Sequence, residues 1–325
     1  LGGGSFVQRR ILPVLKDVLS IQVTCLHKQN IIEAKQIATQ FGIPYAVSSR
    51  EELLNHPEVE AVLIATPNDC HEEDAIACAQ AGKPTLCEKP LAPTSQAIIR
   101  MQESFAEHDI PLFVGQSLRF KPAIQKAKEL LKEGSLGNLL HIRVYFTIPV
   151  PSGNWRYKKS SGGGVLQDVG VHLIDLIHHI SGENIASVHA IANLMYKRDS
   201  SESEHTVLAF GRLSGEACFS FECSMNQPLR SGFEIIGTKS RIISTHSLRQ
   251  AHDSGESLCH VREDSSLEYL PLKATNIYAD ELTHFAQVLR GEVSPLISSS
   301  VGLCNQRVIE SAYESIHSGQ MISNF

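Results

Sequence analysis

The sequence predicts an α/β protein of two domains, and its length and two patterns of apolar residues support that prediction. The chain has 325 residues, which is more than one hydrophobic core usually serves. Its first third alternates short apolar runs with helical patterns, as in a parallel sheet with helices on both faces. After about residue 120, strand-like runs follow one another without helices between them, which favours an antiparallel or mixed sheet. We therefore expect domains at residues 1–118 and 119–325.

The elements expected in the first domain follow from apolar runs and from helix-end signals. Ser49 with Glu52 fits a capping box, and Gly42 and Gly82 stand where helices need a C-terminal cap. Strands are expected at Ile21–Leu26, Ala61–Thr66, Thr85–Cys87 and Leu112–Gly115. Helices are expected at Val7–Val18, Ile31–Phe41, Glu51–Asn55, Glu72–Gln80 and Ser95–Glu107.

The second domain begins with a different order of elements. A helix is expected at Pro122–Glu133, a long strand at Leu139–Ile148 and a glycine-opened helix at Gly162–Ser181. Strand-like runs then follow at Ala186–Met195, Thr206–Leu213, Glu216–Ser224, Gly232–Ile236 and Arg241–Thr245. Helical patterns at Tyr278–Arg290 and Ser299–Ser318 complete the expected elements.

The charge balance argues against a nucleic-acid or membrane-surface partner. The chain carries 29 Lys and Arg residues against 35 Asp and Glu residues, and its net charge of −6 includes no long basic block. No apolar run approaches the roughly 20 residues that span a bilayer, and no signal-peptide pattern is seen. The 8 cysteines form no CxxC pair, which favours reduced thiols in a cytoplasmic protein over a disulfide framework. A soluble protein with a small-molecule partner is therefore expected.

A glycine-rich turn opens directly into the first expected helix. Gly2, Gly4 and Val7 occupy the key places of the G-x-G-x-x-G/A pattern, with valine in the third place. Such a turn lets a pyrophosphate approach the start of a helix, where backbone N–H groups attract anions. The alternative is a flexible glycine leader, which the strand–helix alternation that follows makes less attractive. Because the pattern normally follows a strand, we expect a first strand before Leu1.

Cofactor preference depends on the residue about 20 positions further on, which often is an acid that binds the ribose 2′-hydroxyl. That place holds Leu26-His27-Lys28. Without a carboxylate to repel it, a 2′-phosphate would be tolerated and could pair with Lys28. This favours NADP slightly over NAD. The alternative is that His27 and Lys28 are merely solvated side chains.

Polar residues follow two of the expected parallel strands, at the sheet edge where ligands bind. One strand runs into Pro67-Asn68-Asp69-Cys70-His71, and another into Glu88-Lys89-Pro90. A lysine in such a turn can polarise a substrate oxygen or carry a proton. The alternative is that Glu88 and Lys89 form an ordinary surface pair.

The segment after Gly162-Gly163-Gly164 predicts a buried helix with an acid–base face. Asp168, His172 and Asp175 are four and three residues apart and share one face of a helix, while the residues between them are mostly apolar. Buried carboxylates and imidazoles are costly unless paired or functional, and His suits acid–base work near neutral pH. Two alternatives stay open: a core polar network, and a metal site that continues to His179.

Short motifs follow the glycine turn in a fixed order. They are Ile64-Ala65-Thr66-Pro67-Asn68 with His71, Cys87-Glu88-Lys89-Pro90-Leu91-Ala92, Val114-Gly115 with Arg119-Phe120, Trp155-Arg156, Gly162-Gly163-Gly164 with Asp168, Gly170, His172 and Asp175, and Glu234-Ile235-Ile236-Gly237-Thr238. With Gly2-Gly3-Gly4 at the start, the chain resembles the Gfo/Idh/MocA oxidoreductases (glucose–fructose oxidoreductase, inositol dehydrogenase and relatives) over essentially its whole length.

This resemblance implies an N-terminal Rossmann dinucleotide-binding domain and a C-terminal α/β domain with a large open, mainly antiparallel sheet. That sheet commonly joins subunits into homodimers or homotetramers. The resemblance implies catalytic roles for Lys89, Asp168 and His172, and a cis Lys89-Pro90 peptide. The implied cofactor-binding residues are Gly2, Gly4, Ser5, Phe6, His27, Lys28, Thr66, Pro67, Asn68, His71, Glu88 and Lys89, and the implied substrate-binding residues are Arg119, Trp155, Arg156, Asp168 and His172. His27 in place of an acid, and Gln116-Ser117-Leu118 in place of an extra arginine, depart from the family pattern.

The resulting hypothesis is reversible hydride transfer between NAD or NADP and a secondary alcohol or ketone of a sugar, sugar derivative or cyclitol, with no metal ion. In oxidation, His172 accepts the hydroxyl proton, Lys89 stabilises charge on the same oxygen, and Asp168 orients the substrate or the imidazole. Asp175 is expected to support these side chains without contacting the substrate itself. A metal-dependent hydrolase and a non-catalytic dinucleotide-sensing regulator stay open as alternatives. Members of the family that use the cofactor transiently for epimerisation or glycoside cleavage share the same motifs.

Overall fold

A computed structural model describes residues 1–151, 154–159, 162–193, 203–248 and 256–323 of the chain. The chain divides into two compact units, one comprising Leu1–Gln116 with Asn276–Leu303 and the other Ser117–Thr275 with Cys304–Phe325. The second unit begins within two residues of the expected boundary. The segment 276–303, which we expected in the second domain, belongs instead to the first unit.

The first unit is built on short parallel strands. Strand β1 (Cys25–His27) pairs with β2 (Tyr45–Val47), and β3 (Val62–Ile64), β4 (Thr85–Glu88) and β5 (Leu112–Gly115) form a second group. Leu1 lies between the two groups: its carbonyl oxygen accepts from Ala65 N (2.9 Å), and Gly2 N donates to His27 O (3.2 Å). The parallel arrangement confirms the expected strand–helix alternation, although β2 was not foreseen.

The helices of this unit begin and end close to the expected residues. They are α2 (Ile31–Phe41), α3 (Arg50–Leu54), α4 (His71–Gln80) and α5 (Ser95–Glu107). Asn30 caps α2 by accepting from Ile32 N and Glu33 N, and Gly42 ends it in the left-handed conformation. The helix expected at Val7–Val18 is instead a π-helical stretch, η1 (Val7–Ile11), followed by α1 (Leu12–Leu15). Pro13 has no N–H to donate to the preceding turn, and the geometry changes beside it.

The segment 276–303 joins the first unit through aromatic and backbone contacts. Helix α8 (Ile277–Leu289) places Phe285 edge-on against Phe113 of β5, with ring centroids 5.3 Å apart. Tyr278 packs in the same way against Phe6, at 5.6 Å. Val114 N also donates to Ile297 O (2.9 Å), which extends the edge of the sheet. These contacts explain why α8 groups with the first unit although it lies more than 150 residues away in the sequence.

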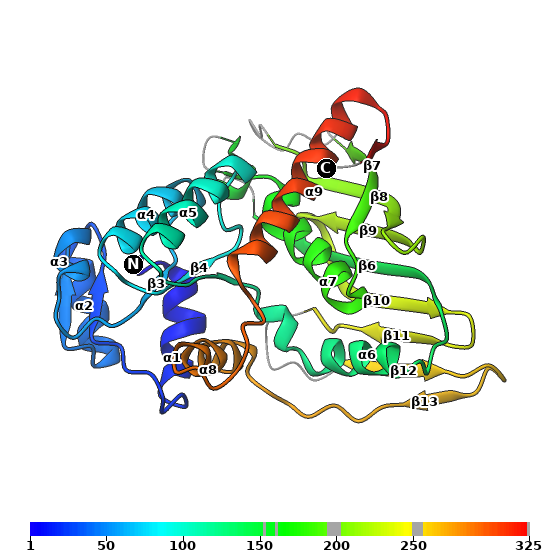
Figure 1. Cartoon of the computed structure of the whole chain (residues 1–325), viewed down its shortest axis with the longest axis horizontal. Coiled ribbons are helices and arrows are strands. Elements are labelled where there is room, and N and C mark those ends of the chain that lie inside the picture. The colour runs from blue at the N-terminus through cyan, green and yellow to red at the C-terminus, as the bar shows by residue number, and fades with distance from the viewer. Residues whose placement is uncertain (152–153, 160–161, 194–202, 249–255, 324–325) are drawn as a thin grey trace. The chain divides into compact units, whose positions relative to one another are not determined.

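The second unit contains a nine-stranded sheet of order β13-β12-β11-β10-β6-β9-β8-β7-β14 (Figure 1). All its neighbouring pairs are antiparallel except β6 with β9, which confirms the mainly antiparallel sheet. Its strands are β6 (Leu139–Pro149), β7 (Ile185–Asn193), β8 (Thr206–Leu213), β9 (Cys218–Ser224), β10 (Asn226–Gly237), β11 (Arg241–Thr245), β12 (Ser257–Val261), β13 (Leu267–Tyr269) and β14 (Ile322–Ser323). The last three were not foreseen, and Met195 of the expected β7 lies outside the described residues.

Helices α6 (Pro122–Lys132) and α7 (Val171–Ser181) pack against each other beside this sheet, and α7 contacts β6 and β9 (Figure 1). Along β8, residues alternate between buried and exposed, so one face of the strand meets the core. The exposed residues include Leu208 and Phe210, opposite Ile191 and His189 of β7. Helix α9 (Ser299–Ser318) follows α8. No helix within the described ranges is long and apolar enough to cross a membrane, and all eight cysteines are free thiols.

Candidate active site

The glycine turn at the start of the first unit fits a phosphate group. Gly2 has φ +89°, and a Cβ there would lie 2.5 Å from Ala65 O, so the close approach of the turn to the end of β3 requires glycine. A Cβ at Gly4 would meet nothing within 4 Å, and Gly4 and Ser5 are exposed at the start of the helical backbone. Helix-start N–H groups beside open space are suited to bind an anion.

The end of β1 carries the residues expected to meet the adenosine ribose. Lys28 Nζ lies 3.1 Å from Glu33 Oε2 of α2, in an ion pair that is partly exposed on both sides. Burial lowers the pKa of His27 below its ordinary value, so this imidazole is neutral at pH 7. Lys28 is therefore the cation at this position, and Glu33 already pairs with it.

The turn after β3 is held by a chain of polar contacts. Thr66 Oγ1 donates to Asp74 Oδ2 (2.7 Å), and Arg50 Nη1 donates to Asp74 Oδ1 (3.0 Å). His71 is fully buried, with Nε2 3.0 Å from Thr66 O and Nδ1 2.9 Å from Pro90 O. Both imidazole nitrogens thus meet backbone carbonyls of two strand-end turns. Because burial lowers the pKa of His71, the neutral imidazole can donate to only one of the two oxygens, and its expected contact with the cofactor stays a prediction.

Strand β4 ends at Glu88, and the turn that follows it contains Lys89 and Pro90, whose peptide bond is cis, as the resemblance implied. In the sheet register Glu88 lies opposite Gly115 of β5, and a Cβ at Gly115 would come 3.2 Å from the Glu88 carboxyl. Burial raises the pKa of Glu88 to about 7, although the Lys89 charge and the Lys89 N–H favour the anion. Lys89 therefore stands at the ligand-binding edge of the sheet, beside a carboxyl group that titrates near neutral pH.

In the second unit, Asp168 lies in a π-helical stretch, η6 (Leu166–Gly170), that continues into α7. The expected helix therefore begins after the three glycines, because Gly164 has φ +128° and a Cβ at Gly163 would lie 2.5 Å from Arg156 O. Arg156 Nε donates to Asp168 Oδ2 at 2.6 Å. π-Helical turns often occur at functional sites. The pair brings together two of the residues expected to bind substrate.

His172 and Asp168 are almost completely buried, with 3% and 7% of their surfaces exposed. They lie four residues apart on the helix that begins beside the glycines. Trp155 begins a short turn with Arg156 (Trp155–Tyr157), but its side chain lies outside the part that the structure describes. Lys89 belongs to the first unit and the Asp168–His172 pair to the second.

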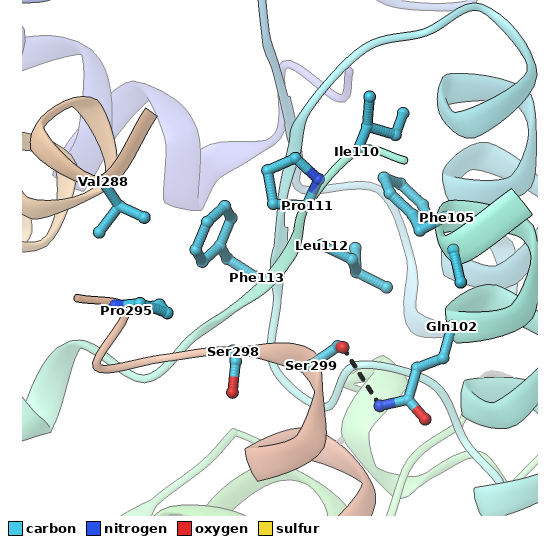
Figure 2. Close-up of a pocket in the computed structure, with 11 residues that line it drawn as sticks. Gln102, Phe105, Ile110, Pro111, Leu112, Phe113, Val288, Pro295, Ser298 and Ser299 are labelled. Carbon is cyan, nitrogen blue, oxygen red and sulfur yellow. Dashed lines mark hydrogen bonds between the residues drawn. The ribbon is translucent and has the colours of Figure 1, made fainter. Parts of the chain in front are cut away.

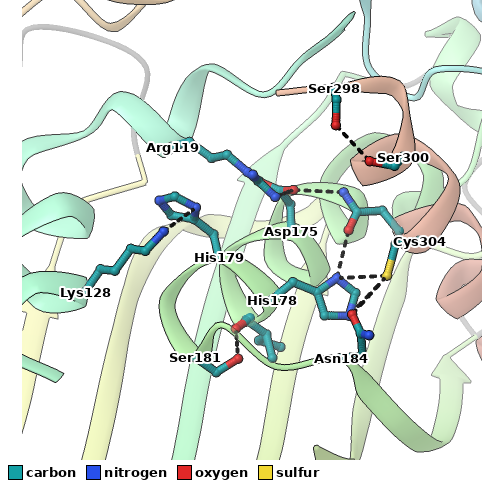
Figure 3. Close-up of polar contacts among 12 residues, drawn as sticks. Arg119, Lys128, Asp175, His178, His179, Ser181, Asn184, Ser298, Ser300 and Cys304 are labelled. Carbon is teal, nitrogen blue, oxygen red and sulfur yellow. Dashed lines mark hydrogen bonds and ion pairs between the residues drawn. The ribbon is translucent and has the colours of Figure 1, made fainter. Parts of the chain in front are cut away.

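Asp175 and Arg119 form a buried network of their own (Figure 3). Arg119 donates to both carboxylate oxygens of Asp175 at 2.8 and 2.7 Å, and Asn305 Nδ2 donates to Oδ1 at 2.9 Å. Burial alone would raise the pKa of Asp175, but Arg119 and Asn305 bring it below its ordinary value. His178 Nδ1 donates to Asn305 Oδ1 (3.0 Å), because its Nε2 accepts from Ile185 N (3.2 Å). Two guanidinium nitrogens of Arg119 thus donate to Asp175, and its expected contact with substrate stays a prediction.

The metal-site alternative included His179, which the structure pairs with a lysine. Lys128 Nζ lies 3.3 Å from His179 Nδ1 (Figure 3). Burial and the nearby positive charges of Arg119 and Lys128 lower the pKa of His179 to about 3. Within the described ranges, no group of three or more His, Cys, Asp or Glu side chains is arranged to hold a metal ion.

A pocket of about 330 Å³ in the first unit is lined by none of the candidate site residues (Figure 2). Phe105 and Gln102 of α5 line one side, Val288 and Pro295 line the other, and Pro111–Phe113 pass between them. Gln102 Nε2 donates to Ser299 Oγ (3.1 Å) at its edge. Because β5 enters the sheet at Leu112 and ends at Gly115, this pocket lies at the opposite end of the strand from Glu88. We therefore do not assign the active site to it.

The strand-end turns and the glycine turn define the first unit as a dinucleotide-binding domain of the Rossmann type. The second unit is a sheet domain with a buried helix that carries Asp168 and His172. Residues 1–116 match the model of an oxidoreductase family described as having an NAD-binding Rossmann fold, and residues 124–243 match the Gfo/Idh/MocA C-terminal domain. Together these matches cover more than two thirds of the chain. The chain belongs to the Gfo/Idh/MocA family and is an NAD(P)-dependent oxidoreductase.

Individual relatives agree with this assignment. The chain is 28% identical to the 1,5-anhydro-D-fructose reductase of Ensifer adhaerens, over 82% of this chain and 80% of that protein. It is 26% identical to the myo-inositol 2-dehydrogenase of Thermotoga maritima, over 93% and 90% of the two chains. The solved complex of levoglucosan dehydrogenase with NADH and levoglucosan has the same fold, with a TM-score of 0.88, 23% identity and coverage of 99% and 97%.

Proposed function

We propose that this oxidoreductase transfers a hydride between the nicotinamide of NAD or NADP and a secondary alcohol or ketone carbon of a sugar, sugar derivative or cyclitol. The observation that carries the proposal is the buried helix on which Asp168 and His172 lie four residues apart, in a chain of this family. The named relatives act on 1,5-anhydro-D-fructose and myo-inositol, which are cyclic polyhydroxylated compounds. We expect a substrate of the same chemical class.

The proposed cofactor site lies at the strand ends of the first unit. Gly2, Gly4, Ser5 and Phe6 would hold the pyrophosphate against the helix start, and His27 and Lys28 would meet the adenosine ribose. The nicotinamide half of the cofactor would contact Thr66, Pro67, Asn68 and Glu88. His71 would support the two turns through its contacts with the carbonyl oxygens of Thr66 and Pro90. The bound nicotinamide supplies the hydride acceptor or donor at its C4 position.

The proposed chemistry divides among three side chains. In the oxidative direction the carbinol carbon loses a hydride, and His172 accepts the hydroxyl proton as general base. Lys89 donates a hydrogen bond to the same oxygen and stabilises the negative charge that develops on it. Asp168, with its Oδ2 held by Arg156, orients the substrate or the imidazole. Arg156, Trp155 and Arg119 are further candidates for substrate contact, and Arg119 also donates to Asp175.

The test compares catalytic variants with matched surface variants. His172→Asn and Lys89→Ala should each lower kcat by about 100-fold or more, while the dissociation constant of the dinucleotide stays nearly unchanged. His108→Asn and Lys126→Ala replace the same residue types at exposed or partly exposed helix positions and should keep wild-type turnover. Turnover would be followed as NAD(P)H absorbance with a panel of sugars, sugar derivatives and inositols. Near-normal turnover in either catalytic variant would refute the assignment.

We further propose that NADP is slightly preferred, because Lys28 can pair with a 2′-phosphate and no carboxylate follows β1 directly. The family match is to an NAD-binding fold, and the levoglucosan dehydrogenase complex contains NADH. Fluorescence titration with both cofactors distinguishes the two. Binding of NAD at least about tenfold tighter than NADP, a difference of about 1.4 kcal/mol, would reverse the preference.

We also expect a cytoplasmic homodimer or homotetramer joined through the nine-stranded sheet. Ile191, Leu208 and Phe210 are 57%, 46% and 52% exposed on the paired strands β7 and β8, and exposed apolar clusters favour association. The free cysteines agree with a reducing compartment. Sedimentation equilibrium should show dimers or tetramers for the wild type and a shift towards monomers for Phe210→Asp. A wild-type protein that is monomeric at high micromolar concentration would contradict this expectation.

A further inference from the structure

A buried carboxylate outside the predicted site contacts the start of the helix that carries Asp168 and His172. Glu204, which precedes β8, has only 6% of its surface exposed. Its Oε1 accepts a hydrogen bond from Leu166 N (3.0 Å), and its backbone oxygen accepts one from Val165 N (3.3 Å). One residue therefore satisfies two of the N–H groups that the first turn of a helix leaves without partners.

The same carboxylate is held from a second direction. Tyr313 of α9 donates its hydroxyl to Glu204 Oε1 at 2.9 Å. Burial raises the pKa of both Glu204 and Tyr313, as expected for acids removed from water. Glu204 forms no ion pair with a Lys or Arg side chain in the described parts of the chain. A carboxylate that is buried without a salt bridge is costly. The Leu166 N–H at the helix start, the Tyr313 hydroxyl and the positive charge of Lys159 favour its anion.

Gly164 makes room for this arrangement. A Cβ at Gly164 would lie 2.7 Å from the Tyr313 hydroxyl oxygen and 2.8 and 3.0 Å from the two Glu204 carboxylate oxygens. Gly164 O also accepts from Asp168 N (3.0 Å), so the turn that begins at Gly164 ends at the candidate catalytic carboxylate. No side chain within the helix itself caps this end, because Val165 makes no side-chain cap bond.

We propose that Glu204, fixed by Tyr313, is a positioning residue: a cap supplied from another part of the chain that sets the start of the helix presenting Asp168 and His172. The inference rests on the proposed function for its catalytic consequence. Glu204 acts through the backbone of Leu166 and Val165, so it reaches Asp168 only two residues further along the same turn. Losing the cap frees this turn, and a misplacement of about 1 Å at a catalytic group can lower the rate by about 100-fold.

The test uses variants that remove the cap in steps. Glu204→Met keeps the size of the side chain but has no acceptor for Leu166 N, whereas Glu204→Gln keeps the acceptor and loses the charge. Tyr313→Phe removes a single hydroxyl, and it serves also if Glu204→Met does not fold. Glu183 provides the matched control, because its Oε2 accepts from Gly215 N (2.6 Å) in the same unit and it follows the far end of α7. Glu183→Met and Glu183→Gln should behave as wild type.

Three measurements are made on the full-length protein. Hydrogen exchange of the peptide spanning residues 165–172 should be faster by roughly tenfold in Glu204→Met, less so in Tyr313→Phe and least in Glu204→Gln. The value of kcat should fall in the same order, by about tenfold or more in Glu204→Met, equivalent to about 1.4 kcal/mol. Titration with NAD and NADP should show full stoichiometry and unchanged affinity, which separates a misplaced helix from a partly unfolded sample.

The outcomes separate this inference from the proposed function. Wild-type kcat and wild-type exchange in Glu204→Met would overturn the inference while leaving the proposed function intact. Faster exchange with unchanged kcat would also overturn it, because the cap would then be structural only. If the wild type oxidises no member of the substrate panel, the proposed function fails, and exchange at residues 165–172 still decides whether Glu204 caps the helix.

Discussion

The two parts of the candidate site are held by different kinds of contact. In the first unit, the Lys89 turn is fixed through backbone groups: the two ring nitrogens of His71 face the carbonyl oxygens of Thr66 and Pro90, and the neutral imidazole donates to one of them. In the second unit, the Asp168–His172 helix is fixed through charged side chains, with Arg156 on Asp168, Arg119 on Asp175 and Glu204 at the first turn. In the first unit, the His71 contacts that hold the turn do not involve the side chains of Glu88 and Lys89. In the second unit, the candidate catalytic residue Asp168 and the structural residue Asp175 lie on the same helical segment, and each is held by an arginine.

This difference predicts that substitutions at the buried charges of the helix cost more stability than substitutions at the strand ends of the first unit. Asp175 on the helix and its partner Arg119 are buried, and removing one partner of a buried ion pair leaves an uncompensated charge. The side chains of the turn after β4 are only partly buried, although Pro90 beside them is covered. Three substitutions test the contrast, starting with the one for which the largest effect is expected.

Asp175→Ala should cause the largest loss of stability. It leaves the Arg119 guanidinium buried without its bidentate partner, which typically costs about 3–5 kcal/mol. Urea unfolding followed by circular dichroism measures the loss. Glu129→Ala, which removes an exposed ion pair with Lys126, is the control and should cost less than about 1 kcal/mol. Equal effects of the two substitutions would show that the buried network does not hold the helix.

Glu88→Gln should have an intermediate effect that depends on pH. Because the pKa of Glu88 is about 7 in the folded protein and 4.5 is the ordinary value, the folded state holds a proton that the unfolded state releases between these values. The stability that this proton contributes is complete below pH 4.5 and is lost as the pH rises to about 7. Because the Glu88 side chain is partly exposed, we expect the free energy of unfolding of the wild type to fall by about 1–3 kcal/mol over this pH range.

The measurement is the urea midpoint of the wild type and of Glu88→Gln at several pH values from 4.5 to 8. The amide does not titrate, so the variant should gain stability relative to the wild type as the pH rises. Glu107→Gln at the exposed end of α5 should follow the wild-type curve. Parallel curves for the wild type and Glu88→Gln would mean that the carboxyl titrates normally.

The sequence predicts best those helices and strands whose ends are set by capping residues or by an alternation of buried and exposed residues. Helix α2 begins and ends at the expected residues, because Asn30 caps its start and Gly42 ends it. Strand β8 also has its expected bounds, because one face is buried and the other exposed along its whole length. Strand β13 has three residues, which are too few to show an alternation, and it forms only because β12 offers a partner.

The parts that could not be predicted depend on residues that meet only after folding. Spacing along one helix identified Asp168, His172 and Asp175, but it could not tell which of the two carboxylates pairs with Arg119. Asn305 and Glu204 lie 130 and 38 residues from the atoms they contact, and neither belongs to a motif. The assignment of 276–303 to the first unit likewise depends on aromatic contacts such as Phe113 with Phe285. These contacts leave no periodic pattern in the sequence.

Lys28→Ala should have the smallest effect on stability and a selective effect on the cofactor. Its ion pair with Glu33 is partly exposed, so its loss should cost no more than about 1 kcal/mol. If Lys28 contacts a 2′-phosphate, the variant should bind NADP roughly tenfold more weakly and NAD with unchanged affinity. Glu33→Gln removes the competing carboxylate and should strengthen NADP binding instead. Equal weakening of both cofactors by Lys28→Ala would mean that the lysine supports the turn after β1 and does not choose between them.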